Sequence, residues 1–252
     1  MLDVAHLTVR HGSLTVLEDI GFELTTGQWL MVAGPNGAGK TTLINAISQG
    51  VPYSGDIYYL DQNVKRMRPS ALAREIGVLS QTHQAGYAFT VGEVVSMGRY
   101  AHQKSRLAFT GMQCEEKVQK ALEITGMTQF KHKSVLTLSG GELQRTFLAQ
   151  VFAQDPNLIL LDEPANHLDL KYQKQLFELL EEWIKQPGRA IISVVHDLGL
   201  ARAYGTHALL LNQGRMAAYG SNKHVLNREN LQNVYGMDVY DWMRSLLSGW
   251  EV

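Results

Sequence analysis

The chain has 252 residues, of which 45% are hydrophobic and 19% are charged, and its formal net charge is −1. This length accommodates one large domain or two small ones with a sizeable core, and the near-neutral charge excludes the strongly basic field typical of nucleic-acid binders. The single cysteine, Cys114, excludes an intramolecular disulfide.

The N-terminus lacks the charged start and apolar middle of a signal peptide. The longest apolar runs, such as residues 158–161 and 190–195, are far too short to cross a bilayer. We therefore expect a cytoplasmic globular protein, in which any link to a membrane comes through another protein.

The first 80 residues predict a mixed β and α organisation. Apolar and polar residues alternate as in strands, and a fully apolar run precedes a glycine-rich loop and a helical pattern. Turns containing Pro52 and Gly55 precede further short strands. The expected strands are 2–9, 16–24, 29–33, 56–60 and 76–79, and the expected helix is 41–49.

Between residues 90 and 154 the pattern becomes helical, with apolar spacing such as Val91, Val94 and Val95, and we interpret this stretch as a helical subdomain. Strands and helices then alternate, so the core sheet resumes. The expected strands are 158–161, 190–195 and 207–211, and the expected helices are 170–184 and 198–204. The tail after Asn227 has helical stretches to which the sequence assigns no chemical role.

A glycine-rich loop, GPNGAGKT at residues 34–41, follows the apolar strand and opens the first helix; we call it the phosphate loop. Its glycines permit a tight turn whose N–H groups point at phosphate oxygens, at the positive end of a helix. Lys40 would reach the β- and γ-phosphates, and Thr41 would offer its hydroxyl to Mg²⁺. The candidate phosphate-binding residues are Gly34, Pro35, Asn36, Gly37, Ala38, Gly39, Lys40, Thr41 and Thr42.

Two carboxylates, Asp162 and Glu163, follow the apolar strand 158–161; we call them the acidic strand end. The carboxyl edge of a sheet places Asp162 where it can hold Mg²⁺ directly or through water, which leaves Glu163 free to orient or deprotonate water. Taken alone, the same letters describe a buried strand that meets a polar loop at Pro164. The phosphate loop upstream favours the catalytic interpretation.

A second small, N–H-rich turn, LSGGELQR at residues 138–145, precedes a helix; we call it the signature turn. Ser139, Gly140 and Gly141 would form an anion site of the same physical type as the phosphate loop. The alternative is an ordinary N-cap with a flexible turn.

These motifs, in this order, resemble the nucleotide-binding subunit of ATP-binding cassette (ABC) transporters over nearly the whole chain. The resemblance implies an α/β fold with a P-loop NTPase (RecA-like) core, an N-terminal antiparallel β subdomain and an inserted α-helical subdomain. We expect a single domain in which residues 1–88 and 156–252 form the β and RecA-like core and residues 89–155 form the helical subdomain.

The resemblance also assigns roles to single residues. Gln81 would be the Q-loop glutamine that touches Mg²⁺ or the attacking water, and Asp169 would belong to the D-loop at residues 166–169. His196 would be the H-loop histidine that contacts the γ-phosphate. His11 stands where the family commonly places an aromatic residue that stacks on adenine; an exposed loop histidine is the alternative.

In this family two subunits meet head to tail, so the signature turn of one chain would face the γ-phosphate held by Lys40 of the other. The resemblance thus implies a homodimer that buries two ATP molecules, with Mg²⁺ as the metal cofactor. Glu163 would be the general base, positioned by His196.

Residues 89–100, which follow the Q-loop, are similar to a stretch in importers of iron-siderophore, haem and cobalamin complexes. Such an importer uses two copies of a permease and an extracytoplasmic substrate-binding protein, so this chain would be peripheral on the cytoplasmic side of the inner membrane. We expect residues around Arg99 and Tyr100 to dock on the permease; the alternative is an amphipathic helix that packs on the helical subdomain.

Two other functions remain as alternatives. A non-transport ABC ATPase acting on nucleic acid or the ribosome would carry a coiled-coil insertion, a zinc module or a second cassette, and the sequence contains one copy of GPNGAGKT and one cysteine. A non-hydrolysing regulator is disfavoured by the intact Asp162, Glu163 and His196. We expect no nucleic-acid partner and no structural metal.

Overall fold

The computed structural model describes residues 1–80, 88–102, 112–166 and 168–250. The chain divides into two compact units. Unit 1 comprises Met1–Lys65 and Val194–Val252, and unit 2 comprises Arg66–Ser193.

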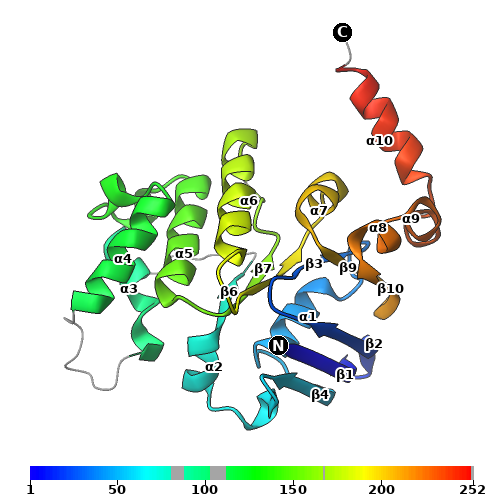
Figure 1. Ribbon diagram of the computed structural model, residues 1–252, viewed down its shortest axis with the longest axis horizontal. Coiled ribbons are helices and arrows are strands. Elements are labelled where there is room, and N and C mark those ends of the chain that lie inside the picture. Colours follow the sequence, from blue (N-terminus) through cyan, green and yellow to red (C-terminus); the bar gives the residue numbers. More distant parts are fainter. Residues whose placement is uncertain (81–87, 103–111, 167, 251–252) are drawn as a thin grey trace. The chain divides into compact units, whose positions relative to one another are not determined.

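Unit 1 contains a four-stranded antiparallel sheet with the order β2-β1-β4-β5. Its strands are β1 (Leu2–His11), β2 (Leu14–Leu24), β4 (Ser54–Tyr59) and β5 (Gln62–Asn63). Buried and exposed residues alternate along much of β1 and β4, as expected for strands with one face on a core. Figure 1 shows β1, β2 and β4 side by side, next to α1 (Lys40–Ile47).

Unit 1 also contains three strands in the order β10-β9-β3. All five residues of β3 (Trp29–Ala33) are buried, and β3 pairs in parallel with β9 (His207–Asn212). A parallel strand covered on both faces is uniformly apolar rather than alternating. The other elements are β10 (Arg215–Ser221), α7 (Leu198–Tyr204), α8 (Asn222–Val225), α9 (Arg228–Tyr235) and α10 (Val239–Ser248).

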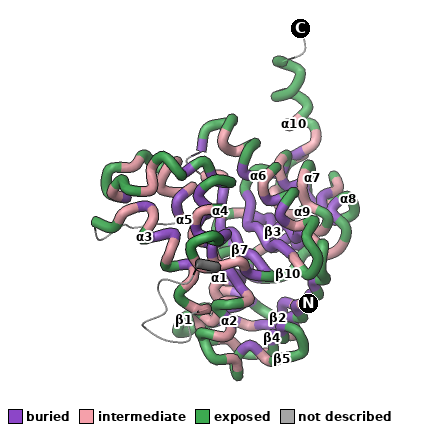
Figure 2. The backbone as a smooth tube through the Cα atoms, turned by 60° about the vertical axis from the view of Figure 1, so that its left-hand side comes forward, coloured by how far each residue is buried: buried purple, intermediate pink, exposed green. Residues whose placement is uncertain are grey.

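Unit 2 is built on three strands in the order β8-β7-β6. They are β6 (Ile76–Leu79), β7 (Leu158–Asp162) and β8 (Ala190–Val194), at whose end the chain returns to unit 1. Every residue of β7 and β8 is buried, and Figure 2 shows β7 in purple. The parallel register sets Leu79 opposite Leu161, so β6 and β7 end at one edge of the sheet.

The remaining elements of unit 2 are mostly helical. They are α2 (Pro69–Glu75), α3 (Val91–Met97), α4 (Met112–Ile124), α5 (Gly140–Gln154), α6 (Leu170–Ile184) and the 3-10 turns η2 (Tyr100–His102), η3 (Thr128–Phe130) and η4 (Val135–Thr137); a further turn, η1 (Val64–Arg66), lies at the boundary of the units. Figure 1 shows α3, α4 and α5 packed together. Capping boxes begin α3 and α5, with Thr90 and Ser139 as the capping residues.

Most expected elements are confirmed. The strands 29–33 and 76–79 and the helices 170–184 and 198–204 have the expected bounds. The sequence did not predict α2, whose signal is Pro69 at the first helical position, or β10, which lacks apolar alternation. Strand β10 is held by its backbone ladder with β9.

Within the described ranges, no helix combines the length and apolar character that a membrane span needs.

Candidate active site

The phosphate loop leaves the buried strand β3 and enters α1 through positions that only glycine can occupy. Gly34 has φ 147°, and a Cβ there would lie 2.1 Å from the carbonyl oxygen of Leu211. Gly39, the N-cap of α1, has φ 97°, and its Cβ would lie 2.4 Å from Cδ2 of Leu17. The left-handed backbone and these close approaches together fix the path of the loop.

Lys40 lies against this loop and is only 6% exposed. Its Nζ donates to the carbonyl oxygen of Gly34 at 2.7 Å and to that of Pro35 at 2.9 Å. A buried ammonium group needs such acceptors because desolvation of an unpaired charge is costly. The side chain is therefore held within the turn that its own backbone forms, where it can meet a phosphate.

The start of α1 suits an anion. Within the described residues, no side chain caps α1, and its first turn contains no acidic residue. No carboxylate of that turn therefore neutralises the positive end of the helix dipole. Inside the loop, the Ala38 N–H donates to the carbonyl of Pro35 at 3.2 Å, and Gly37 has φ 80°. Thr41 is exposed and Thr42 is half-buried on α1.

His196 lies after β8, beside the strand that leads into the phosphate loop. The preceding residue, Val195, donates its N–H to the carbonyl oxygen of Val32 at 3.1 Å. The following residue, Asp197, caps α7 by accepting from the N–H groups of residues 199 and 200 at 2.7 and 3.1 Å. The exposed His196 is therefore held from both sides, within the same unit as Lys40.

His11 ends β1 at the tip of the β1–β2 hairpin, where it is exposed and pairs with Leu14. Leu14 is 66% exposed, so the tip presents an apolar surface next to the histidine. The same hairpin lies against the phosphate loop through Leu17 and Gly39. Sequence reasoning overlooked Leu14, although an apolar residue directly after a Gly-Ser turn was a usable signal.

The phenol of Tyr235, the last residue of α9, interacts with the backbone of Gly34. Burial raises the pKa of its phenol, and the hydrogen bond with Gly34 offsets only part of that rise. The C-terminal tail, to which the sequence assigned no role, thus contacts the phosphate loop within unit 1. No local signal marks Tyr235, because the contact exists only in the folded chain.

The acidic strand end lies in unit 2. Asp162 ends β7 and is 3% exposed, and Glu163 has a left-handed backbone with φ 52°. Asn166 donates its side-chain amide to Oε2 of Glu163 and its N–H to the carbonyl oxygen of Glu163 at 3.1 Å. The turn therefore orients the Glu163 carboxylate, and the sequence offered Asn166 only as a member of a motif.

The signature turn begins α5 with a closed capping box. Oγ of Ser139 accepts from the N–H of Glu142 at 3.3 Å, while Oε2 of Glu142 accepts from the Ser139 N–H at 2.7 Å and from its hydroxyl at 2.9 Å. These hydrogen bonds from Ser139 lower the pKa of the Glu142 carboxyl. Gly140 and Gly141 form the first turn of the helix.

One contact that the sequence did not predict joins the signature helix to the acidic strand end. The side-chain amide of Gln144 donates to the carbonyl oxygen of Pro164, the residue after Glu163. Gln144 lies on the first turns of α5, so the start of that helix is attached directly to the chain that leaves the acidic strand end.

Asp169 caps α6, with its Oδ1 accepting from the N–H of Tyr172 at 2.9 Å. Gln81 and His167, which the resemblance assigns to the Q-loop and D-loop, lie outside the described residues. The predicted Mg²⁺ ligands within the described residues are therefore the Thr41 hydroxyl and the Asp162 carboxylate. Both are hard oxygen donors, which fit Mg²⁺.

Comparison with known proteins extends over nearly the whole chain. Residues 17–166 match the ABC transporter family. The ferric enterobactin transport ATP-binding protein FepC of Escherichia coli (strain K12) is 37% identical over 234 residues, which cover 92% of this chain and 85% of that protein. The hemin import ATP-binding protein HmuV of Thermobifida fusca (strain YX) is 35% identical over 240 residues, which cover 95% and 83%.

A solved structure of a metal-chelate type ABC transporter in an inward-facing conformation is similar in fold. The TM-score is 0.81 and the sequence identity is 26%, over 94% of this chain and 89% of that chain. The likeness therefore includes both units.

Proposed function

The chain belongs to the ABC transporter family, and we propose that it is the ATP-hydrolysing subunit of an importer that carries a metal chelate through a separate permease. Its α/β fold is that of the P-loop ATP-binding cassettes. Ferric enterobactin and hemin are the cargoes of relatives 37% and 35% identical to this chain, which supports a ferric siderophore or haem as cargo. Cobalamin as a cargo is supported only by the sequence resemblance of residues 89–100.

The observation that carries the ATPase part of the proposal is the position of Lys40. A buried ammonium group lies on the carbonyl oxygens of a loop whose path only glycine permits, at an uncapped helix start. That combination supplies a fixed positive charge and backbone N–H groups for the β- and γ-phosphates of ATP.

Different residues of the chain carry out different parts of ATP hydrolysis. Lys40 neutralises charge on the transferred phosphoryl group, and Glu163, oriented by Asn166, accepts the proton of the attacking water. Thr41 and Asp162 would hold Mg²⁺, which when bound would neutralise charge on the phosphate oxygens. His196 positions the water and contacts the γ-phosphate, while His11 and Leu14 pack on the adenine.

A second copy of the chain completes each site. Ser139, Gly140 and Gly141 of one copy face the γ-phosphate held by the phosphate loop of the other, and Asp169 belongs to the same interface. ATP therefore bridges two surfaces that associate weakly without it, and hydrolysis removes the bridge. The cycle of closing and opening drives the permease.

The assembled importer comprises two copies of this chain, two copies of the permease and an extracytoplasmic substrate-binding protein that delivers cargo. The chain lies on the cytoplasmic side of the membrane through its contact with the permease. Its near-neutral charge supports the absence of a nucleic-acid partner.

Co-purification tests the transport assignment. The chain is expressed with the products of its neighbouring genes, isolated from membranes in detergent, and assayed for ATPase activity with each candidate chelate loaded on the binding protein. We expect a multi-span permease whose ATPase rises with one chelate. A soluble dimer that hydrolyses ATP alone, or only with a nucleic acid, would move the function to a non-transport ATPase.

A Glu163→Gln variant tests the chemistry independently of cargo. We expect turnover to fall by about 10²- to 10⁴-fold, the typical contribution of a general base, while an ATP-bound dimer accumulates on gel filtration. The matched control is Glu178→Gln on the exposed face of α6, where Glu178 pairs with Lys174 at 3.6 Å and turnover should not change. Normal turnover by Glu163→Gln would remove Glu163 from its role.

A further inference from the structure

The segment that sequence analysis assigned to permease docking divides into an outward part and an inward part. Phe89, Met97 and Tyr100 are 40%, 39% and 67% exposed, and they form the apolar surface of the docking segment (residues 89–100). Arg99, in contrast, is half-buried and reaches into unit 2. Arg99 therefore contacts the interior of unit 2, whereas its neighbour Tyr100 is exposed for docking.

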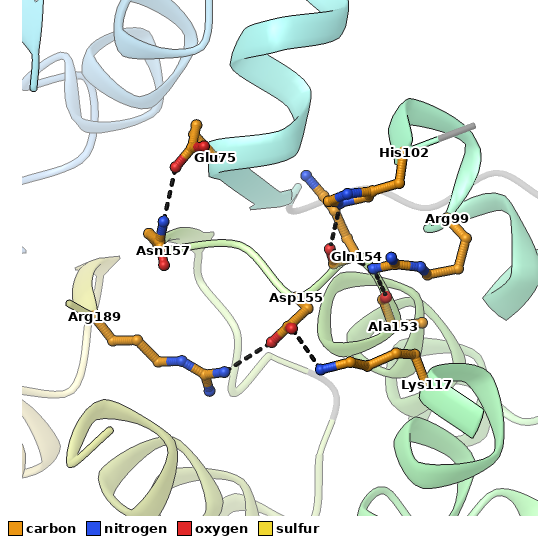
Figure 3. Close-up of polar contacts among 9 residues, drawn as sticks. All are labelled: Glu75, Arg99, His102, Lys117, Ala153, Gln154, Asp155, Asn157 and Arg189. Carbon is orange, nitrogen blue, oxygen red and sulfur yellow. Dashed lines mark hydrogen bonds and ion pairs between the residues drawn. The ribbon is translucent and has the colours of Figure 1, made fainter. Parts of the chain in front are cut away.

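Arg99 and His102 bind the C-terminal end of α5. NH1 of Arg99 donates to the carbonyl oxygens of Ala153 at 2.9 Å and Gln154 at 3.0 Å, and Nε2 of His102 lies 2.9 Å from the Gln154 oxygen (Figure 3). These are carbonyls that a helix end leaves without intrahelical partners, at the negative end of the helix dipole. Burial, and secondarily the charge of Arg99, lower the pKa of the His102 ring from its ordinary value.

Gly98 brings the docking segment into direct contact with the same helix. A Cβ at this buried position would lie 2.2 Å from the carbonyl oxygen of Gln150, on the last turns of α5. Only glycine allows this approach. The end of α3, Gly98 and η2 are therefore fastened to the end of α5 by one close backbone contact and three hydrogen bonds.

The fastening point is the junction between α5 and β7 (residues 153–157), which other elements of unit 2 also hold (Figure 3). Asp155, with φ 55°, accepts from Lys117 of α4 at 2.6 Å and from Arg189 at 2.7 Å (Figure 3). Burial acts to raise the pKa of the Asp155 carboxyl, but the hydrogen bond and charge of Lys117 and the charges of Arg189 and Arg99 outweigh it, so the pKa is lowered.

Backbone contacts hold the same junction. The Asn157 N–H donates to the carbonyl oxygen of Glu75 at 2.9 Å, and the Ala190 N–H donates to the carbonyl oxygen of Asn157 at 3.0 Å. The side chain of Asn157 adds a bond of 2.8 Å to the Glu75 carboxylate (Figure 3). The junction is thus a fixed pivot next to β6, β7 and β8.

This pivot lies between the two parts of unit 2 that act on nucleotide in the proposed function. On one side, α5 runs 15 residues, or about 22 Å, back to the signature turn. On the other side, β7 runs five residues to the acidic strand end. The first turns of α5 are also joined to the acidic strand end, by the hydrogen bond from Gln144 to the carbonyl oxygen of Pro164, so a tilt imposed at the C-terminal end of the helix must be taken up at that contact.

We propose that Arg99 and His102 are positioning residues: they fasten the docking segment to the α5–β7 junction, so that a permease seated on the segment tilts α5 and reorients the signature turn relative to the acidic strand end. The inference rests on the proposed function, because it requires a permease. Tyr100 and its exposed neighbours then dock on the permease, and Arg99 and His102 transmit the movement of the permease to α5.

The test compares three variants of the complete transporter, reconstituted in detergent with its permease. Arg99→Ala should retain the permease on co-purification and retain the ATPase of the isolated subunit, but lose stimulation by the permease about tenfold, within the usual range of coupling between sites. His102→Ala should act in the same direction with a smaller loss. Tyr100→Ala should instead weaken co-purification of the permease.

Lys117→Ala is the matched control, because Lys117 binds the same junction through Asp155 from α4 rather than from the docking segment. We expect it to keep full stimulation. Equal loss of stimulation in Lys117→Ala and Arg99→Ala would show that only the integrity of the junction matters, and normal stimulation in Arg99→Ala would also overturn the proposal.

Two further outcomes have defined meanings. If Arg99→Ala unfolds, the test uses His102→Ala and Arg99→Lys instead. Arg99→Lys keeps the positive charge but loses the planar guanidinium donor. Normal stimulation by the permease in both variants would overturn the proposal. If the wild-type chain brings no permease, the proposed function itself fails and this inference fails with it. A wild-type chain with a permease and an unaffected Arg99→Ala overturns the inference alone.

Discussion

Two helix starts in this protein have the same electrostatic character and are built in opposite ways. Helix α1 begins at a left-handed glycine, Gly39, and has Lys40 as its first residue. Helix α5 begins at Ser139 with a reciprocal capping box, in which Glu142 occupies the N–H and hydroxyl donors of Ser139. The first start is organised by backbone conformation and a cation, and the second by a carboxylate.

The difference indicates how the two starts would meet a phosphate. At α1 the first turn carries no acidic residue, so a phosphate meets the Lys40 ammonium group and the helix N–H groups without competition from a carboxylate of that turn. At α5, the phosphate and the Glu142 carboxylate would compete for the same donors of Ser139, so the contact is weaker and conditional. We infer that nucleotide binds first at the phosphate loop and that the signature turn engages afterwards.

The largest effect is expected from Lys40→Ala. Removing the buried cation should lower ATPase activity by about 10²- to 10³-fold or more, the usual consequence of losing one transition-state donor, and should weaken ATP binding. The measurement is steady-state ATPase with fluorescent-nucleotide titration. Lys65→Ala is the control, because Nζ of Lys65 also donates to a glycine carbonyl, that of Gly55 at 2.6 Å, away from the loop. Wild-type turnover in Lys40→Ala would contradict the comparison.

Gly39→Ala should destabilise the start of α1. The left-handed backbone alone costs about 1–2 kcal/mol for an alanine, and the new Cβ would also lie 2.4 Å from Cδ2 of Leu17. The Tm should fall by several degrees, measured by differential scanning fluorimetry. Gly12→Ala shares the left-handed backbone, with φ 60°, but has no heavy atom within 4 Å of its Cβ. Equal shifts in Tm would mean that the close approach at Gly39 is unimportant.

Ser139→Ala tests the start of α5 against the start of α3, which has an equivalent capping box in the same unit. Loss of the cap should cost about 0.5–2 kcal/mol, and Thr90→Ala, which opens the equivalent box with Glu93 on α3, should cost a similar amount. Only Ser139→Ala should reduce ATP-driven dimerisation, measured by light scattering with a Glu163→Gln background. If both variants dimerise alike, the signature turn is an ordinary cap.

The smallest effect is a pH dependence. Hydrogen bonds from Ser139 lower the pKa of Glu142, so its carboxylate contributes stability that is complete above the unfolded pKa of about 4.3 and is lost as pH falls through the folded value. Glu142→Gln keeps the box but not the charge, so its Tm deficit should be present at pH 7 and shrink below about pH 4.

Solvent screens this exposed pair, and we expect the deficit to be smaller than that of Ser139→Ala. Glu93→Gln is the control and should show the same pH trend, because Thr90 lowers the pKa of Glu93 in the same way. A deficit that grows on acidification would contradict the assignment.

Local pattern predicted the elements that are buried throughout or amphipathic. The strand 29–33 and the helix 170–184 were predicted with their observed bounds, because apolar runs and helical spacing reflect burial directly. The hairpin tip was not predicted: β1 extends to His11 and β2 begins at Leu14, where backbone pairing continues between exposed residues that do not alternate with buried ones. Strand β10 was missed for the same reason.

The sequence by itself determined the phosphate loop, the acidic strand end and the signature turn, because each is a short stretch whose chemistry depends on residue type and spacing. Only the tertiary structure decided which distant residues support them. Tyr235 meets Gly34, Gln144 meets Pro164, and Arg99 meets the end of α5 across more than 50 positions. Such contacts follow from packing of whole elements, and no periodicity in the chain encodes them locally.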